Sequence, residues 1–260
     1  MDLGINGHTA LVCASSHGLG RACATELARA GCRVVVNGRE GAALEETARA
    51  IRDGTGAQVI AVAGDIGDAG VQQAMVDAAE GAVDILVNNN GGPPLRDFRE
   101  VDRAALHAGV DANMAVPIEM VQRVIPGMIE RGWGRIVCIT SASVKMPIPG
   151  LDLSSGARIG LTGFLAGVAR QVAPHGVTLN FLLPGAFDTR RIQSMNETTA
   201  RREGISPDEV RARRERNIPA RRLGDPAEFG AACAFLCSAH AGYITGQSLL
   251  LDGGAYPGVL

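Results

Sequence analysis

Hydrophobic residues along this chain fall into short continuous runs that alternate with longer segments of mixed polarity. Runs rich in Val, Leu and Ile predict buried β-strands at 9–14, 33–38, 59–66, 84–89, 135–140, 177–185 and 248–254. The segments between them carry apolar residues at helical spacing, at 18–31, 40–54, 68–81, 101–131, 155–173, about 200–216 and 226–238. Because strands alternate with helices, we predict an α/β fold with a parallel sheet covered by helices on both faces.

The alternation runs through the chain without a linker or an internal repeat. We therefore predict one Rossmann-like domain over residues 1–260, built on a doubly wound parallel sheet. Residues 186–225 are the exception, because they are polar, charged and poorly patterned as sheet. We expect this segment to form a mobile lid over a substrate site.

Composition narrows the class of protein. Hydrophobic residues make up 46 % of the 260 residues and aromatic residues only 3 %, so Ala, Val, Leu and Ile must build the core. A net charge of −2 argues against a nucleic-acid partner held by bulk charge. The six cysteines include no CxxC pair, and no signal or membrane-spanning run is visible. We expect buried reduced thiols, no metal site, no membrane partner and a cytoplasmic location.

A glycine-rich turn, CASSHGLGRA at 13–22, follows the first predicted strand. Gly18 and Gly20 would let the backbone approach a pyrophosphate, and the start of the helix favours negative charge. The pattern therefore predicts a dinucleotide site, with a purely structural tight turn as the alternative.

The end of the second strand indicates which dinucleotide binds. The sequence there is Asn37-Gly38-Arg39, without the acid that an NAD site usually offers to the ribose hydroxyls. Arg39, assisted by His17, would instead pair with a 2′-phosphate, so we predict NADP in preference to NAD. The alternative is that both are exposed loop residues.

The order of these motifs resembles that of the short-chain dehydrogenase/reductase family over nearly the whole chain. The turn resembles the family's TGxxxGxG, with Cys13 and Ala14 in place of Thr and the first Gly. Further matches are the adenine-capping pair Asp65-Ile66, the turn Asn88-Asn89-Asn90-Gly91, and the nicotinamide stretch with Asn180, Pro184, Gly185 and Thr189.

This resemblance implies an oxidoreductase that reduces a small-molecule carbonyl or oxidises an alcohol with NADP or NAD. Similar proteins are often 3-oxoacyl-carrier-protein reductases. The resemblance assigns cofactor binding to Ala14, Ser16, His17, Gly18, Leu19, Gly20, Arg39, Asp65, Ile66, Asn89, Gly91, Arg158, Pro184, Gly185 and Thr189. It assigns catalysis to Ser141, to the helix-bending Asn113, and to positions 154 and 158.

The family's proton chemistry uses YxxxK, whose Tyr follows the catalytic Ser by thirteen residues. Here that spacing leads from Ser141 to Ser154 and Arg158, so SxxxR replaces YxxxK. A serine hydroxyl titrates far above the phenol pKa of about 10, and one cation does not bring it near neutrality. Serine also ends roughly 4 Å short of the tyrosine oxygen. Arg158 keeps a positive charge at this place but cannot act as a proton carrier, because an arginine pKa exceeds about 12 and the group does not release its proton.

Three outcomes stay open at this point. In the first, Ser141 and Ser154 bind a carbonyl, Arg158 polarises it, and a water chain through Asn113 delivers the proton. In the second, another ionisable group replaces the tyrosine, with Lys145, Asp152 and Tyr256 as candidates. In the third, the chain is a redox-inactive nucleotide-binding pseudoenzyme or catalyses a non-redox step.

One face of the predicted helix 155–173 carries four glycines, Gly156, Gly160, Gly163 and Gly167. They fall within about 60° of one another, on the side opposite Ser154 and Arg158. Each destabilises the helix by roughly 1 kcal/mol relative to alanine, so we expect another helix to pack closely there. That helix belongs either to the same subunit or, as the resemblance suggests, to a neighbour in a homodimer or homotetramer.

Two proline-containing segments, 91–98 and 146–152, should wall the substrate pocket together with the lid. Arg96, Arg190 and Arg191 would lie beside it. They either meet an anionic substrate, such as a carboxylate or a phosphopantetheine carrier, or remain solvated.

Overall fold

A computed structural model describes residues 2–92 and 95–258, which contain one parallel sheet of seven strands in the order β3-β2-β1-β4-β5-β6-β7. The strands are β1 (Thr9–Val12), β2 (Arg33–Gly38), β3 (Val59–Ala63), β4 (Ile85–Asn88), β5 (Gly134–Ile139), β6 (Val177–Pro184) and β7 (Ser248–Leu251). The chain first builds outward from β1 to β3 and then returns to place β4 on the other side of β1. Ligands bind such sheets at the carboxyl ends of the strands beside this switch point.

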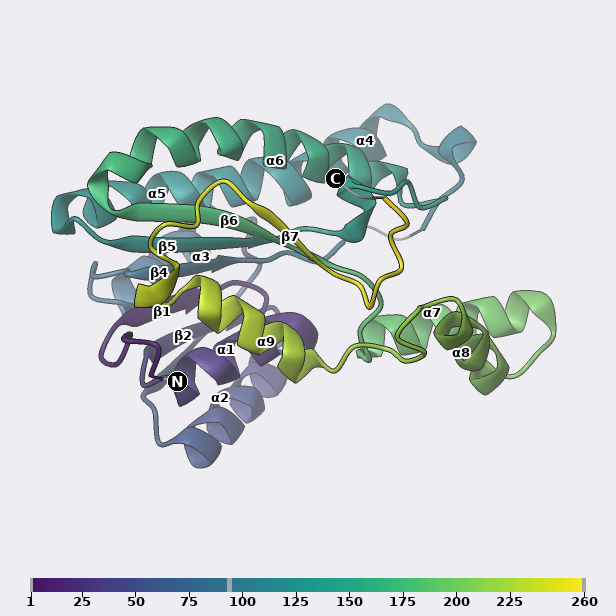
Figure 1. Cartoon of the computed structure of the whole chain (residues 1–260), viewed down its shortest axis with the longest axis horizontal. Helices are drawn as coiled ribbons and strands as arrows, with labels where there is room; N and C mark the ends of the chain where they lie inside the picture. Colours follow the sequence, from purple (N-terminus) through teal and green to yellow (C-terminus); the bar gives the residue numbers. More distant parts are fainter. Residues whose placement is uncertain (1, 93–94, 259–260) are drawn as a thin grey trace.

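Helices cover both faces of the sheet (Figure 1), as continuously apolar strands require. One face carries α1 (Gly18–Arg29), α2 (Gly41–Thr55) and α9 (Pro226–Leu236), and the other carries α3 (Ala69–Ala78), α5 (Val116–Arg131) and α6 (Asp152–Val172). Each face has its own hydrophobic core, which Leu27 and Leu44 represent on the first face and Met120 and Leu165 on the second. The predicted α/β class and doubly wound sheet are confirmed.

The helix predicted over 101–131 is divided in the structure. Between α4 (Arg103–Val110) and α5 lies one wider π-helical turn, Asp111–Ala115, in which hydrogen bonds span five residues instead of four. Asn113 lies in this turn, so the expected local distortion of the helix at Asn113 is present. Hydrophobic spacing did not reveal the break, because apolar residues continue at helical spacing on both sides of it.

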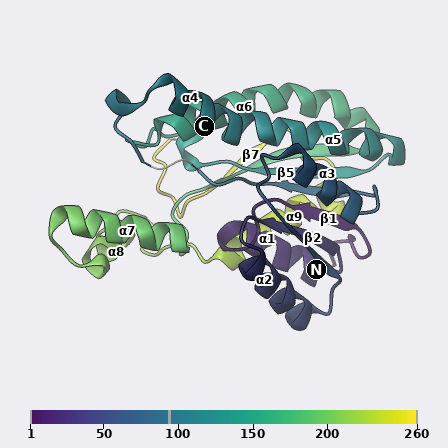
Figure 2. The same ribbon diagram turned by 180° about the vertical axis from the view of Figure 1, so that it is seen from behind.

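Residues 186–225, which we call the lid, contain the two helices α7 (Arg190–Glu203) and α8 (Pro207–Arg216). The helices pack against each other and extend beyond the sheet (Figures 1 and 2). The prediction of a helix near 200–216 located α8 but missed most of α7. Only Asn196 and Ala200 of α7 are buried, so no apolar stripe marks that helix in the sequence.

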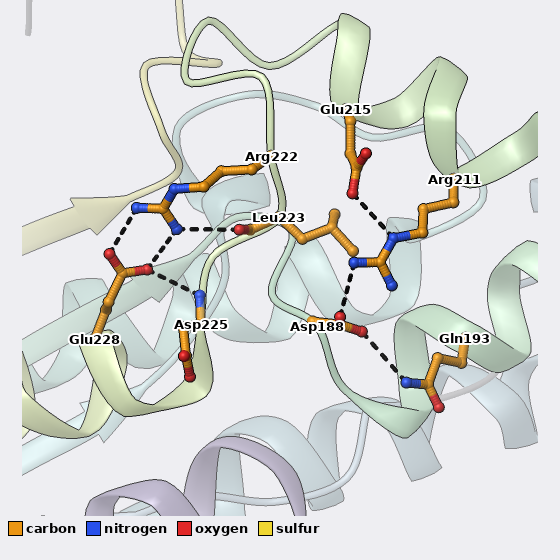
Figure 3. A network of polar contacts seen from close by, with 8 residues as sticks. All are labelled: Asp188, Gln193, Arg211, Glu215, Arg222, Leu223, Asp225 and Glu228. Carbon is orange, nitrogen blue, oxygen red and sulfur yellow. Dashed lines mark hydrogen bonds and ion pairs between the residues drawn. The ribbon is translucent and has the colours of Figure 1, made fainter. Parts of the chain in front are cut away.

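Ion pairs hold the lid at both of its ends (Figure 3). Arg211 of α8 donates to Asp188 at 2.8 Å, and this guanidinium holds the pKa of the Asp188 carboxyl below its usual range. At the other end, Arg222 donates through two nitrogens to Glu228 of α9, at 2.6 and 2.7 Å. These pairs are partly exposed and each adds little stability, but together they fix where the lid leaves and rejoins the domain. Movement of the lid stays a prediction.

Candidate active site

Backbone contacts that only glycine permits close the turn between β1 and α1. A Cβ built on Gly20 would lie 2.5 Å from the Ala14 carbonyl oxygen and 2.9 Å from Nδ2 of Asn89. That Asn89 amide donates to the same carbonyl at 3.0 Å, so the end of β4 holds the turn in place. Gly18 has a φ of +58° and Ala14 a φ of +44°, both in the left-handed region. Ala14 adopts this conformation with a Cβ, which destabilises the turn by roughly 1 kcal/mol.

The first turn of α1 presents amides that its N-cap side chain does not satisfy. His17 occupies the N-cap position with an extended backbone, is exposed, and makes no capping hydrogen bond through its side chain. Unpaired N–H groups and the helix dipole both favour an anion at this end of the helix. The turn and the helix start thus have the shape and the charge that a pyrophosphate requires.

The carboxyl end of β2 offers no acid to a ribose. Asn37 is buried, and its side-chain amide donates to two backbone carbonyls at the end of β3, at 3.0 and 3.1 Å. A Cβ on Gly38 would lie 2.9 Å from Oγ of Ser16, so a carboxylate there would displace Ser16. Arg39 is exposed and makes no hydrogen bond or ion pair with any described residue. This guanidinium is therefore available to a 2′-phosphate.

A cavity of about 800 Å³ opens at the carboxyl ends of the strands. Its lining brings together most of the predicted site residues: Ala14, His17, Gly18, Leu19, Asn89, Gly91, Ser141, Ser154, Arg158, Pro184, Gly185 and Thr189. Six predicted residues lie outside the lining: Ser16, Gly20, Arg39, Asp65, Ile66 and Asn113. Of these, Asp65 is exposed after β3 and accepts a hydrogen bond from the Gly67 amide at 2.9 Å, with Ile66 buried next to it.

Ser154 and Arg158 share one face of α6, are only 5 % and 7 % exposed, and both line the cavity. Arg158 donates through Nε to Ser154 Oγ at 3.0 Å. It also donates to the carbonyls of Ile139 at 2.7 Å and Asn90 at 3.4 Å. Three neutral acceptors therefore fix the guanidinium. Because Ser154 Oγ accepts from Arg158, the hydroxyl hydrogen of Ser154 remains available to a ligand.

Ser141 supplies a second hydroxyl of the same kind. It follows β5, and its Oγ accepts a hydrogen bond from the Ser143 amide at 3.1 Å. The hydrogen of Ser141 is likewise left for a ligand in the cavity. Two hydroxyl donors, each polarised by a donor behind it, can bind the oxygen of a carbonyl group.

Arg158 stays cationic at neutral pH although it is buried. Burial first, and then the positive charge of Arg191, lower the pKa of Arg158 to about 10. The neighbouring Cys138 supplies no counter-charge, because burial raises the pKa of its thiol to about 12. Arg158 forms no ion pair within residues 2–92 and 95–258. A positive charge that lacks a carboxylate partner therefore lies beside the Ser154 hydroxyl, in the cavity that Ser141 also lines.

Asn113 is buried outside the cavity lining. Its Nδ2 donates to the Gly109 carbonyl at 3.4 Å, and its Oδ1 has no hydrogen-bond partner in the described part of the chain. The structure therefore places a buried acceptor at this helix distortion. Its part in a water chain that carries protons stays a prediction.

The three candidates for a substitute acid lie outside the cavity lining. Lys145 and Asp152 are exposed, and Nζ of Lys145 lies 5.9 Å from the ring centroid of Tyr256. The backbone amide of Tyr256 donates to Asp252 at 2.7 Å. The geometry therefore favours the two serines over these candidates as ligands of a substrate oxygen.

The lid brings to the cavity side chains that the sequence did not assign to it. Arg190 and Arg191 line the cavity, whereas Arg96 does not. Arg213 and Arg214 of α8 also line it, and we did not predict them. Their only signal was the density of arginine in the lid, which does not tell which side of a polar helix faces a cavity.

The sequence of this chain is similar to the sequences of known reductases. A family profile described as Enoyl-(Acyl carrier protein) reductase matches residues 13–256. Acetoacetyl-CoA reductase of Allochromatium vinosum is 33 % identical over 252 residues, which cover 95 % of this chain and 98 % of the relative. The 3-oxoacyl-acyl-carrier-protein reductase FabG of Vibrio harveyi is 32 % identical over 257 residues, which cover 98 % and 99 %.

A solved structure agrees with these relatives. L-Sorbose reductase of Gluconobacter frateurii, in complex with NADPH and L-sorbose, superposes with a TM-score of 0.94 at 26 % identity over 100 % of both chains. The chain belongs to the short-chain dehydrogenase/reductase family of oxidoreductases. Among the described residues, no helix is both long and apolar enough to cross a membrane, and no group of three or more His, Cys, Asp or Glu residues forms a metal site. All six cysteines are buried and unpaired.

Proposed function

We propose that this chain is an NADP-dependent carbonyl reductase in which Ser141, Ser154 and Arg158 act on the carbonyl oxygen in place of a tyrosine. One observation carries the proposal. The Oγ atoms of Ser141 and Ser154 each accept a hydrogen bond from the protein, and both residues line the cavity that the residues of the expected nicotinamide stretch also line. The hydroxyl hydrogens are therefore free to bind a single oxygen atom.

The residues present fit a nicotinamide dinucleotide phosphate. Gly20 leaves a cradle that a Cβ would fill, and the first amides of α1 favour the pyrophosphate. Arg39 is available for the 2′-phosphate, and the last two residues of β2, Asn37 and Gly38, carry no acid. NADPH, when bound, supplies the hydride that reduces the carbonyl carbon.

Negative charge develops on the carbonyl oxygen as the carbon gains a hydride. Ser141 and Ser154 donate hydrogen bonds to that oxygen, and the fixed cation of the buried Arg158 stabilises the charge. Neither hydroxyl nor guanidinium releases a proton near neutral pH. We assign the proton that completes the alcohol to a water molecule in the cavity, because water exchanges with solvent and the hydroxide that remains leaves to solvent.

A second function, nucleotide binding without turnover, is favoured by the absence of a phenol at position 154. The two functions differ in one measurement. The reductase oxidises NADPH with some member of a broad carbonyl panel, whereas the binding protein binds NADPH with no turnover across the same panel. Failure to bind either NADPH or NADH would contradict both.

Replacement of Arg39 by alanine should raise the Kd for NADPH about tenfold and leave the Kd for NADH unchanged, because only NADPH carries the 2′-phosphate. Fluorescence titration of the bound nucleotides measures both constants. Arg49→Ala is the matched control, since Arg49 is also an exposed arginine and lies within α2, outside the cavity lining. Equal losses for both nucleotides would show that Arg39 does not select the phosphate.

We also propose that the protein is a homo-oligomer, and the glycine face of α6 supports this proposal. A Cβ on Gly156, Gly163 or Gly167 would meet nothing within 4 Å, whereas one on Gly160 would lie 2.9 Å from the sulfur of Met114. Packing within the subunit thus accounts for Gly160 alone. Phe164 on the same helix is 49 % exposed, so the face is apolar as well as open.

Light scattering should therefore report a dimer or tetramer at micromolar concentration. Gly163→Arg should shift the protein to monomers, because a long charged side chain blocks close helix packing. Gly54→Arg, on the open surface of α2, should leave the assembly intact. A stable native monomer would contradict this interpretation of the glycines.

A further inference from the structure

Among the charged side chains that line the cavity, the positive ones outnumber the negative ones. Five arginines contribute to it: Arg158, Arg190, Arg191, Arg213 and Arg214. Asp252 is the only carboxylate among the described lining residues, and its two oxygens already accept the amides of Gly254 at 2.9 Å and Tyr256 at 2.7 Å. The cavity therefore has an excess of positive charge that its own acid does not balance.

Two of these arginines reach the same short segment from different elements. Arg158 of α6 donates to the Asn90 carbonyl at 3.4 Å, and Arg191 of α7 donates to the Gly92 carbonyl at 3.2 Å. The positive charge of Arg191 lowers the pKa of Arg158, so the two cations repel each other. Repulsion between like charges at this place favours a ligand that brings a negative charge.

Three of these arginines, Arg158, Arg213 and Arg214, differ in how their charge is met. Arg213 pairs with Glu203 at 2.7 Å, which neutralises it. Arg214 is half-buried and donates to the neutral side-chain oxygen of Asn196 at 3.1 Å. The buried Arg158 likewise has only neutral acceptors. A buried or half-buried cation without a carboxylate is unfavourable until an anion joins it.

We propose that the substrate is a short oxo acid, whose carboxylate is bound by Arg191 while its carbonyl oxygen meets Ser141 and Ser154. This inference rests on the proposed reductase function and specifies its substrate class. The first amides of α1 offer the pyrophosphate of the cofactor its own site, whereas Arg191 contacts the 90–92 segment that Arg158 also contacts. A cavity of about 800 Å³ that also receives the nicotinamide leaves room for a small molecule.

The test compares short 2-oxo and 3-oxo acids with their methyl esters, which have the same carbonyl but no charge. Native protein should reduce the acids with a kcat/KM at least about tenfold above the esters, the size expected for one charge-assisted hydrogen bond. Arg191→Glu should raise the KM for the acids about 30-fold and leave the esters within twofold, since repulsion replaces attraction. Arg201→Glu, an equal charge change on an exposed site of α7 outside the lining, should leave both unchanged.

Two further readouts separate the ways in which this proposal fails. If Arg191→Glu weakens NADPH binding and does not distinguish acid from ester, Arg191 is a cofactor ligand and the oxo-acid proposal is overturned. If no carbonyl compound is reduced, the proposed function fails. Calorimetry then decides the anion site alone: native protein loaded with NADPH should bind the oxo acids, and Arg191→Glu should not. Absence of oxo-acid binding to the native protein would overturn the substrate assignment as well.

Discussion

Replacing Gly20 with alanine is expected to raise the Kd for NADPH by about 5- to 150-fold, because overpacking of roughly 1–3 kcal/mol falls on the turn that cradles the pyrophosphate. The new Cβ would lie 2.5 Å from the Ala14 carbonyl, which is a backbone atom and cannot rotate away. The turn must open, and the Asn89 hydrogen bond that closes it at 3.0 Å is then lost. Fluorescence titration of NADPH measures the effect on binding.

A decrease in overall stability has to be separated from the local effect on the turn. Gly54→Ala is the control, because Gly54 lies in α2 and an added Cβ there meets nothing within 4 Å. This control should raise the free energy of unfolding by about 0.5–1 kcal/mol and leave NADPH binding intact. If Gly20→Ala unfolds at the same denaturant midpoint as the native protein and binds NADPH equally well, the turn is not the cofactor cradle.

The sequence predicted the sheet well because its strands are buried on both faces. Runs such as 135–140 and 177–185 are rich in apolar residues, which is a local property that needs no knowledge of the rest of the fold. The division of 101–131 was not predictable in this way. The wider turn at Asn113 depends on how α4 and α6 pack around it. The spacing of hydrophobic residues does not reveal that packing.

The residues of the candidate site likewise fall into those that the sequence predicted and those that it did not. Fixed spacing from Ser141 located Ser154 and Arg158, and the structure places all three in one cavity. Arg213 and Arg214 escaped prediction because their position depends on how α8 packs against α7 beyond the sheet. In a helix with polar residues on every side, the sequence does not show which face is inward.

Installing the family's tyrosine and lysine should increase the reduction of small neutral ketones. We expect the double variant Ser154→Tyr, Arg158→Lys to turn them over about 100-fold faster than the native protein, the contribution typical of a positioned general acid. A phenol beside an ammonium group exchanges its proton near neutral pH, whereas the Ser154 hydroxyl does not. Steady-state oxidation of NADPH measures the difference. In Ser155→Tyr, Arg158→Lys the phenol starts from a residue outside the cavity lining, so this control should gain nothing.

The dependence of kcat on pH distinguishes the chemistry of the native protein from that of the Ser154→Tyr, Arg158→Lys variant, even if both proteins are slow. In the native protein the charge that stabilises the oxyanion belongs to Arg158, whose pKa is lowered to about 10 by burial. Its cation is therefore present through the neutral range, and kcat should stay level there and decline only as the pH approaches about 10. In the double variant kcat should decline at lower pH, because the phenol must be protonated to act as the acid. A native profile that already titrates near neutrality would show that another group supplies the proton, and would contradict the assignment of that step to water.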